Sequence, residues 1–149
     1  VFFKFSNVEI LTRVIELQFP DYKSILKSAQ HDKKILLNTK DFLSVLKRTL
    51  IFVRDNKDAK NGGIFSFENN KLILTGINEN AKIKEELATI QEGENLKISL
   101  NVKFLVDYIS IIGGKVTELR LMNSKSSVVV KDEDNDKSVY FTMPLALRE

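Results

Sequence analysis

The chain has 149 residues, of which 43% are hydrophobic and 29% charged, as is typical of one globular domain. It has no cysteine, which excludes disulfides, thiol catalysis and cysteine-based zinc sites, and its single histidine excludes most histidine-based sites. No apolar run approaches the roughly 18–20 residues that a membrane-spanning helix needs. The net charge of +3 hides a local excess, since residues 21–60 hold ten Lys or Arg against five Asp. This stretch favours a surface that faces a polyanion, although soluble proteins also carry scattered lysines.

The first segment predicts a hairpin, with strands at 1–5 and 10–17 and a turn at 6–9. Nothing later in the sequence is an obvious partner for this hairpin. The chain also does not begin with Met. We therefore expect the hairpin to be the end of a preceding domain, with the chain starting inside a longer protein.

Two segments have helical periodicity. The first is predicted over 39–53, where Phe42, Val45, Leu46, Leu50 and Val53 recur at helical spacing behind capping residues at 38–41. The opposite face is mostly cationic and carries Lys40, Ser44, Lys47, Arg48 and Ile51.

The second helix is predicted to begin at Asn101 and to end at Ile112, with Gly113 in a left-handed conformation after it. Besides its main apolar side it has a second apolar stripe, formed by Phe104, Tyr108 and Ile111. Such a stripe is usually core and less often a docking surface.

The remaining segments predict strands at 33–38, 63–68, 71–77, 81–90, 96–100, 116–122, 127–131 and 138–143. The order is strand, helix and three strands, repeated once, and the residues around Asn38 resemble those around Asn101. Two copies of a β-α-β-β-β unit predict an α+β domain with both helices on the same side of the sheets.

An acidic run has part of the spacing of a calcium loop. Asp132, Asp134 and Asp136 occupy its first, third and fifth positions, but Lys137 stands where glycine is needed and Met143 where glutamate is needed. A solvated hairpin turn over 132–136 explains the run better, so we expect no metal site.

Other hints of catalytic chemistry are incomplete. The pair Gly113-Gly114 before Lys115 lacks the glycine and the hydroxyl residue of a phosphate loop. His31 lies in a polar linker, and Glu85 and Glu86 point to opposite faces of a strand. We therefore expect a non-catalytic binding module that uses no cofactor.

Three segments carry a more specific signal: Gln-Phe-Pro-Asp-Tyr-Lys at 18–23, Leu-Asn-Val-Lys-Phe-Leu-Val-Asp at 100–107, and Ser-Ser-Val at 126–128 followed by Tyr-Phe-Thr-Met-Pro at 140–144. In order and spacing they resemble the last domain of the bacterial DNA sliding clamp, the beta subunit of DNA polymerase III. The resemblance implies that residues 1–20 are the last strands and linker of the middle domain, and that 24–149 are the third domain.

The resemblance also implies the sliding-clamp fold and a function in DNA replication. In that family two head-to-tail subunits of three domains form a ring around double-stranded DNA, without reading its sequence, in the bacterial cytoplasm and nucleoid. The implied DNA-facing residues are Lys40, Lys47, Arg48 and Lys103. The implied subunit interface includes Phe52 and Val53, and this fragment alone is not expected to close a ring.

The family has a hydrophobic pocket that binds linear peptides of the polymerase catalytic subunit, the clamp loader and repair polymerases. The matching residues here are Pro20, Ile25, Asn101, Phe104, Ser127, Phe141, Met143, Pro144 and Leu145. Apolar walls and an adaptable methionine suit an aromatic or aliphatic anchor. The residues alone would favour ordinary core for Phe104, Phe141 and Met143.

Two other interpretations stay open from the sequence. A free-standing peptide- or nucleic-acid-binding adaptor of the same fold would form no ring and would need residues 1–17 to belong to this domain. A metal-dependent hydrolase using the acidic turn is a distant third, because it needs a cluster of carboxylates or histidines that only folding could assemble.

Overall fold

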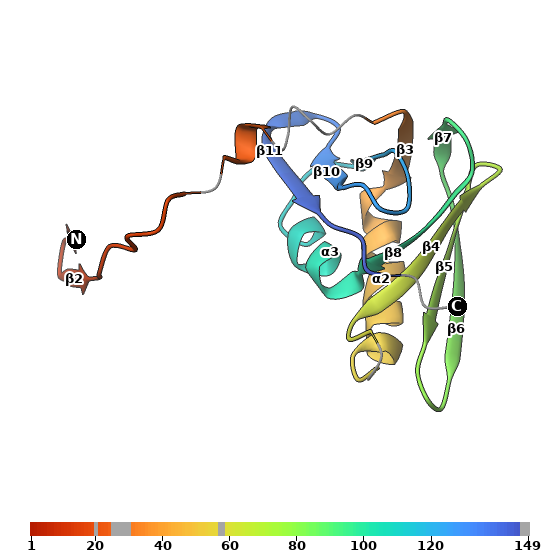
Figure 1. The fold of residues 1–149 in the computed structure, drawn as a ribbon, viewed down its shortest axis with the longest axis horizontal. Helices are drawn as coiled ribbons and strands as arrows, with labels where there is room; N and C mark the ends of the chain where they lie inside the picture. Colours follow the sequence, from red (N-terminus) through yellow and green to blue (C-terminus); the bar gives the residue numbers. More distant parts are fainter. Residues whose placement is uncertain (20, 25–30, 57–58, 147–149) are drawn as a thin grey trace.

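The computed structural model describes residues 1–19, 21–24, 31–56 and 59–146. Its body consists of two antiparallel sheets and two helices that lie side by side (Figure 1). The first copy of the repeat is β3 (Lys33–Asn38), α2 (Thr39–Val53), β4 (Gly62–Glu68), β5 (Lys71–Ile77), β6 (Lys82–Ala88) and β7 (Ile90–Glu92). The second copy is β8 (Leu96–Asn101), α3 (Val102–Ile109), β9 (Val116–Leu121), β10 (Val128–Asp132) and β11 (Asn135–Thr142). The predicted α+β class and duplicated unit are confirmed.

The two copies exchange strands. One sheet has the order β11-β10-β9-β3-β7 and the other has the order β6-β5-β4-β8. The strand before each helix therefore pairs with the first strand after the other helix, β3 with β9 and β8 with β4. Each sheet therefore contains strands of both copies, so the two copies form one domain.

Hydrogen bonds at the helix starts repeat the same relation. The Thr39 amide donates to the Lys115 carbonyl at 2.9 Å, and the Val102 amide donates to the Asn61 carbonyl at 2.8 Å. The side chains of Asn38 and Asn101 cap α2 and α3 by accepting from amides of the first turn. The similarity of the two copies extends past β11. Leu36 in the first copy pairs with Ile90 of β7, and Ser99, the counterpart of Leu36 in the second copy, forms a bridge with Leu145.

The core lies between the helices and both sheets. Phe42 and Leu46 of α2 and Leu105 of α3 have no exposed surface. Two glycines allow the close approach of helix and sheet, since a Cβ on Gly63 would lie 2.6 Å from Val102 Cγ2 and one on Gly76 would lie 2.8 Å from Val53 Cγ1. Among the described residues, no helix is long and apolar enough to cross a membrane.

The end of the second helix differs from the prediction. α3 stops at Ile109, where the Ser110 hydroxyl donates to the Asp107 carbonyl at 3.0 Å and the Ile111 amide donates to the Tyr108 carbonyl at 3.1 Å. Gly113 is not in the left-handed conformation that was predicted for it. The serine side chain and a tightened last turn satisfy the helix end before the glycine is reached.

Two strand predictions also need correction. The single strand expected over 81–90 is divided, since β6 belongs to one sheet and β7 to the other, with Thr89 between them. The acidic turn is shorter than expected, because β10 continues to Asp132 and β11 begins at Asn135. Asp132 is 5% exposed, contacts Gly114 closely and accepts from the Asp134 amide, so it closes the turn. Among the described residues no group of three or more His, Cys, Asp or Glu could hold a metal ion.

The N-terminal hairpin consists of β1 (Phe2–Phe5) and β2 (Val8–Leu11), so its turn is shorter than predicted. Figure 1 shows it extended away from the body, and all residues from 1 to 19 are exposed. Its apolar side chains include Phe2, Phe5 and Leu11, which are 58%, 60% and 82% exposed. Exposed apolar side chains of this kind are expected of strands that belong to the core of another domain.

Candidate functional site

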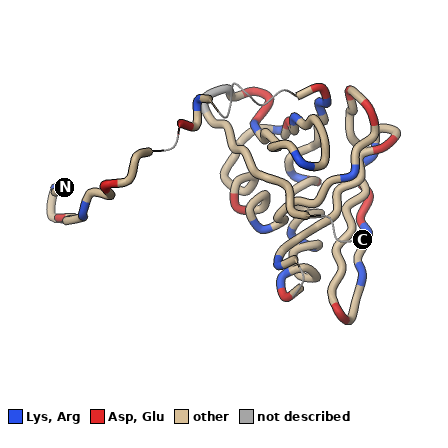
Figure 2. Tube along the Cα trace, viewed as in Figure 1, with Lys and Arg blue, Asp and Glu red and all other residues tan. Residues whose placement is uncertain are grey.

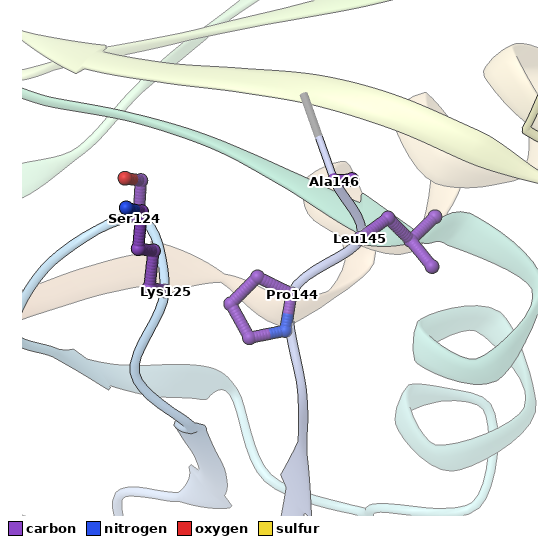
Figure 3. Close-up of a pocket in the computed structure, with 5 residues that line it drawn as sticks. All are labelled: Ser124, Lys125, Pro144, Leu145 and Ala146. Atoms are coloured by element: carbon purple, nitrogen blue, oxygen red, sulfur yellow. The ribbon is translucent and has the colours of Figure 1, made fainter. Parts of the chain in front are cut away.

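The segment after β11 crosses to the other sheet. Its Leu145 amide donates to the Ser99 carbonyl of β8 at 2.8 Å, which adds one bridge beside the end of that sheet. A hollow of about 490 Å³ opens next to this segment and is lined by Ser124, Lys125, Pro144, Leu145 and Ala146. We call it the C-terminal hollow. In Figure 3 the Pro144 ring faces the loop of Ser124 and Lys125, while the Leu145 side chain points away from that loop.

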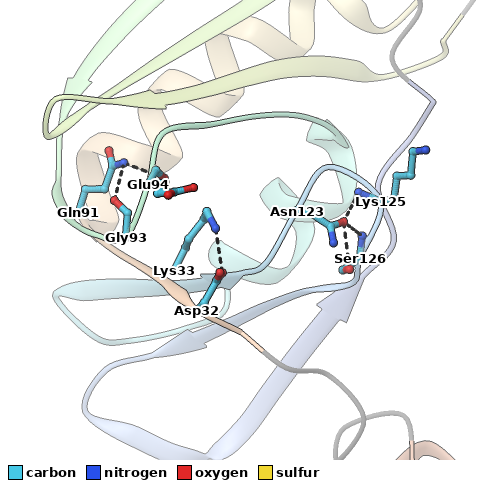
Figure 4. Close-up of polar contacts among 8 residues, drawn as sticks. All are labelled: Asp32, Lys33, Gln91, Gly93, Glu94, Asn123, Lys125 and Ser126. Atoms are coloured by element: carbon cyan, nitrogen blue, oxygen red, sulfur yellow. Dashed lines mark hydrogen bonds and ion pairs between the residues drawn. The ribbon is translucent and has the colours of Figure 1, made fainter.

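The loop on the other side of this hollow has a defined turn. The Asn123 side-chain oxygen accepts hydrogen bonds from the amides of Lys125 at 2.8 Å and Ser126 at 2.9 Å (Figure 4). Asparagine commonly forms such turns with the backbone two and three residues ahead. The turn positions Lys125, an exposed cation, at the wall of the hollow, where it is the charged side chain among the described lining residues.

The predicted peptide-site residues are not all placed alike. Pro144 and Leu145 line the C-terminal hollow, whereas Pro20 and Ile25 lie outside the described residues. Phe104 and Met143 are 51% and 58% exposed. The expectation of ordinary core is therefore wrong for these two residues, which present apolar surface to solvent. Phe141 is half-buried on β11.

The remaining two predicted residues have structural partners. Asn101 is half-buried, and its side chain accepts from the Phe104 amide at 3.2 Å, so it orients the first turn of α3. The Ser127 carbonyl accepts a hydrogen bond from His31 Nε2 at 3.3 Å. The histidine therefore holds the segment before β3 against the start of β10, which agrees with its interpretation as a linker residue.

A second hollow lies where the two helices meet. It has a volume of about 550 Å³ and is lined by Lys47, Leu50, Ile51, Arg54, Asp55, Asn61 and Lys103. We call it the helix hollow. It brings together Lys47 of α2 and Lys103 of α3, two of the predicted DNA-facing residues. Among the described residues that line it, three cations face one carboxylate, which makes this hollow electropositive, although Lys103 also forms an ion pair with Asp107 at 2.5 Å.

The other two predicted DNA-facing residues lie elsewhere on α2. Lys40 is exposed at the start of the helix. Arg48 forms a two-pronged ion pair with Glu85 of β6, at 2.6 and 2.8 Å, and also donates to Ser44 at 2.7 Å. Its charge is therefore largely compensated within the chain. Figure 2 shows that charges of both signs also occur on the strands and loops.

The Arg48–Glu85 pair has an electrostatic consequence. The hydrogen bonds from Arg48 hold the pKa of Glu85 below its ordinary value, against the opposing effect of burial. The same bonds raise the pKa of Arg48. Because Glu85 has a lower pKa in the folded chain than in the unfolded one, its contribution to stability is present above its ordinary pKa and is lost as the pH falls through the folded value.

Replacement of Arg48 by alanine should therefore return the pKa of Glu85 toward its ordinary value. Carboxyl NMR titration of the folded chain measures this pKa directly. The difference in unfolding free energy between the parent chain and the variant should be greatest at neutral pH and should shrink as Glu85 is protonated. A difference that stays constant down to acid pH would contradict this assignment of the pair.

The predicted subunit-interface residues differ in exposure. Phe52 is half-buried, and its carbonyl accepts from the Asn78 side chain at 2.8 Å. Val53 has no exposed surface because it packs beside Gly76 in the core. Its side chain is therefore not exposed in this chain, and its role at a subunit interface stays a prediction. The neighbouring Ile51 is 74% exposed.

Sequence reasoning missed Arg54 and the loop of Ser124 and Lys125. Arg54 immediately follows the predicted helix and could have been found by continuing its cationic face for one more turn. The turn around Asn123 has a local signal, because asparagine followed by serine residues is typical of side-chain-capped turns. That this turn lies close to Pro144 could not be predicted from a single sequence.

Comparison with known proteins adds an independent line of evidence. Residues 23–146 match the family model described as "DNA polymerase III beta subunit, C-terminal domain". The chain is 30% identical over 138 residues to the beta sliding clamp of Pseudomonas aeruginosa, covering 91% of this chain and 36% of that protein. It is 26% identical over 148 residues to the beta sliding clamp of Staphylococcus epidermidis, covering 97% and 38%.

Solved structures agree in fold. A crystal structure of the DNA polymerase sliding clamp from Pseudomonas aeruginosa with a ligand matches with a TM-score of 0.82 and 30% identity, covering 89% of this chain and 36% of that one. The DNA polymerase III beta subunit of Thermotoga maritima matches with a TM-score of 0.84 and 25% identity, covering 99% and 39%. The chain thus spans little more than a third of the length of these relatives.

Proposed function

Because the chain belongs to the family of the DNA polymerase III beta subunit, as its C-terminal domain, we propose that it forms part of a ring-shaped sliding clamp around duplex DNA. The family is that of a processivity subunit, which has no catalytic activity of its own. A closed ring cannot leave DNA sideways, so a polymerase tethered to it stays on its template. The ring acts in the bacterial cytoplasm, on the DNA of the nucleoid.

The observation that carries this proposal is the helix hollow. Lys47 and Arg54 of the first copy and Lys103 of the second lie around one open space between the helices. Cations on a helix pair attract phosphates without reading bases. The flanking apolar residues Leu50 and Ile51 give no hydrogen-bond readout. Because contacts of lysine and arginine with phosphates carry no sequence information, an electropositive surface of this kind suits a protein that must slide along DNA.

Ring closure requires domains beyond this chain, which spans about a third of its relatives. We place the subunit contact near the end of α2, at Phe52 and the exposed Ile51, rather than at the buried Val53. Two such subunits, joined head to tail, would make a homodimeric ring. The N-terminal hairpin and the linker up to residue 20 would complete the preceding domain.

The peptide-binding part of the proposal rests on the exposed Phe104 and Met143 and on the C-terminal hollow beside Pro144 and Leu145. These apolar groups suit a linear peptide with a Leu-Phe anchor, and the proposed site keeps Pro20 and Ile25 on the ground of the family resemblance alone. Lys125 at the wall of the hollow favours an acidic residue next to the anchor. The polymerase catalytic subunit, the clamp loader and repair polymerases would supply such peptides.

Replacement of Lys47 by alanine should weaken the attraction of the 149-residue chain to duplex DNA. Loss of one phosphate contact should lower the slope of log K against log salt by about 0.9. The slope is measured by fluorescence anisotropy of a labelled duplex at several salt concentrations. Lys71, an exposed cation on β5, supplies the matched control as Lys71→Ala. Equal changes in both variants would argue against the helix hollow as the DNA-facing surface.

A further inference from the structure

A third hollow, of about 300 Å³, lies beside the start of α2. Its walls include Leu36, Leu37, Val116 and Ile90, and Thr89 and Glu133 also line it. Ile90 is 63% exposed although it belongs to a strand. A hollow of this size holds one large apolar side chain, and it opens beside an isoleucine that solvent contacts.

The residues that line this hollow in the first copy of the repeat are the counterparts of predicted peptide-site residues in the second copy. In the first copy, Leu36 of β3 pairs with Ile90, which follows the crossing from one sheet to the other. In the second copy, Ser99 of β8 pairs in the same way with Leu145, which follows the crossing after β11. Asn38, which also lines the hollow, caps α2 as Asn101 caps α3.

Thr89 holds the place that Pro144 has in the second copy. It is 8% exposed, and its hydroxyl oxygen has no hydrogen-bond partner in the described structure. Its amide donates to the Asn70 carbonyl at 2.9 Å, which fixes the crossing segment. A buried hydroxyl without a partner is uncommon, and a small rotation toward the hollow would satisfy it with a polar group of a bound chain.

The charge at this hollow is opposite to that at the C-terminal hollow. Glu133, an exposed residue of the β10–β11 turn, is the charged side chain among its described lining residues, whereas Lys125 has that position at the C-terminal hollow. The hollow with Glu133 therefore suits a peptide in which a basic residue stands next to the apolar anchor. The C-terminal hollow suits a peptide with an acidic residue in that place.

We propose that the hollow of Leu36, Ile90 and Glu133 is a second peptide-docking site, which takes a short peptide with an aliphatic anchor flanked by Lys or Arg. The inference rests on the proposed function, because the predicted peptide site is its template. It extends that function, since the domain then holds two peptides of opposite flanking charge, one on each copy of the repeat.

The test titrates two capped peptides, Arg-Lys-Leu-Leu and Glu-Asp-Leu-Leu, into the methyl-labelled 149-residue chain. The basic peptide should shift the methyl resonances of Leu36, Ile90 and Val116, and the acidic one should leave them unchanged. Ile90→Asp should weaken this binding by about tenfold or more. Ile111→Asp is the matched control, because Ile111 is 79% exposed and lies outside the hollow. Glu133→Lys should reverse the preference between the peptides.

Residue-specific shifts separate the two proposals. Shifts confined to the methyl groups of Met143 and Leu145 would support the predicted peptide site and overturn the second one. Shifts at Ile90 without any at Met143 would support the second site while the first fails. Equal weakening by Ile90→Asp and Ile111→Asp, or movement of the Ile90 resonance on dilution without peptide, would also overturn the second site.

Discussion

Replacement of Met143 by alanine is expected to weaken binding of a peptide with a Leu-Phe anchor by at least about tenfold. Met143 is 58% exposed in the free chain, and its unbranched thioether can adapt to an incoming aromatic or aliphatic group. Truncation of a residue that is buried against an anchor typically costs about 2 kcal/mol, or roughly thirtyfold in the dissociation constant. Titration of labelled peptide into the protein with its preceding domains measures the loss.

The control for this prediction is Lys47→Ala, which alters the helix hollow and should leave peptide affinity unchanged. Met143→Ala should in turn leave the salt dependence of DNA attraction unchanged. Equal losses of peptide affinity in both variants would mean that the peptide site is misplaced. The same conclusion would follow if Met143→Ala kept full affinity while its unfolding transition matched that of the parent.

The repeat was predictable because it is written in local signals. Asn38 and Asn101 each precede an apolar run of helical spacing, and in the structure α2 and α3 begin directly after these residues. Alternating patterns predicted strands on either side. The pairing of strands was harder to predict. β3 pairs with β9 and β4 pairs with β8 between residues that lie about eighty and about thirty-five positions apart, and no local pattern specifies such a partner.

The deviations have local physical causes. Ser110 ends α3 before Gly113 because a hydroxyl can satisfy the last carbonyls of a helix. The strand expected over 81–90 divides at Thr89 because the sheets separate there, although its alternation continues on both sides. A period of two identifies a strand without stating to which sheet it belongs.

The candidate site was predictable in part. The exposed positions of Phe104 and Met143 follow from family resemblance and not from apolar spacing, which favoured core for both. The partners of charged residues were not predictable, since Arg48 is compensated by Glu85 of a strand far along the chain. Arg54 joins Lys103 only because α2 and α3 pack side by side.

Replacement of Phe42 by alanine is expected to lower the free energy of unfolding by about 3–5 kcal/mol. Phe42 lies on the buried side of α2 and has no exposed surface, so its removal costs apolar burial and leaves a cavity in the core that both copies share. A loss of this size is a large part of the 5–15 kcal/mol that stabilises a typical domain. Urea unfolding followed by circular dichroism measures it as a lower midpoint at unchanged slope.

Phe104→Ala provides the matched comparison, because it makes the same chemical change on the other helix at a residue that is 51% exposed. Its effect on the unfolding free energy should stay within about 0.5–1 kcal/mol, since little buried surface is lost and alanine favours the helix. It should nevertheless weaken binding of the Leu-Phe peptide, whose proposed site includes this ring. If Phe104→Ala instead destabilised the chain as much as Phe42→Ala, the phenylalanine would be part of the core. The second apolar stripe of α3 would then stabilise the fold and would not bind a partner.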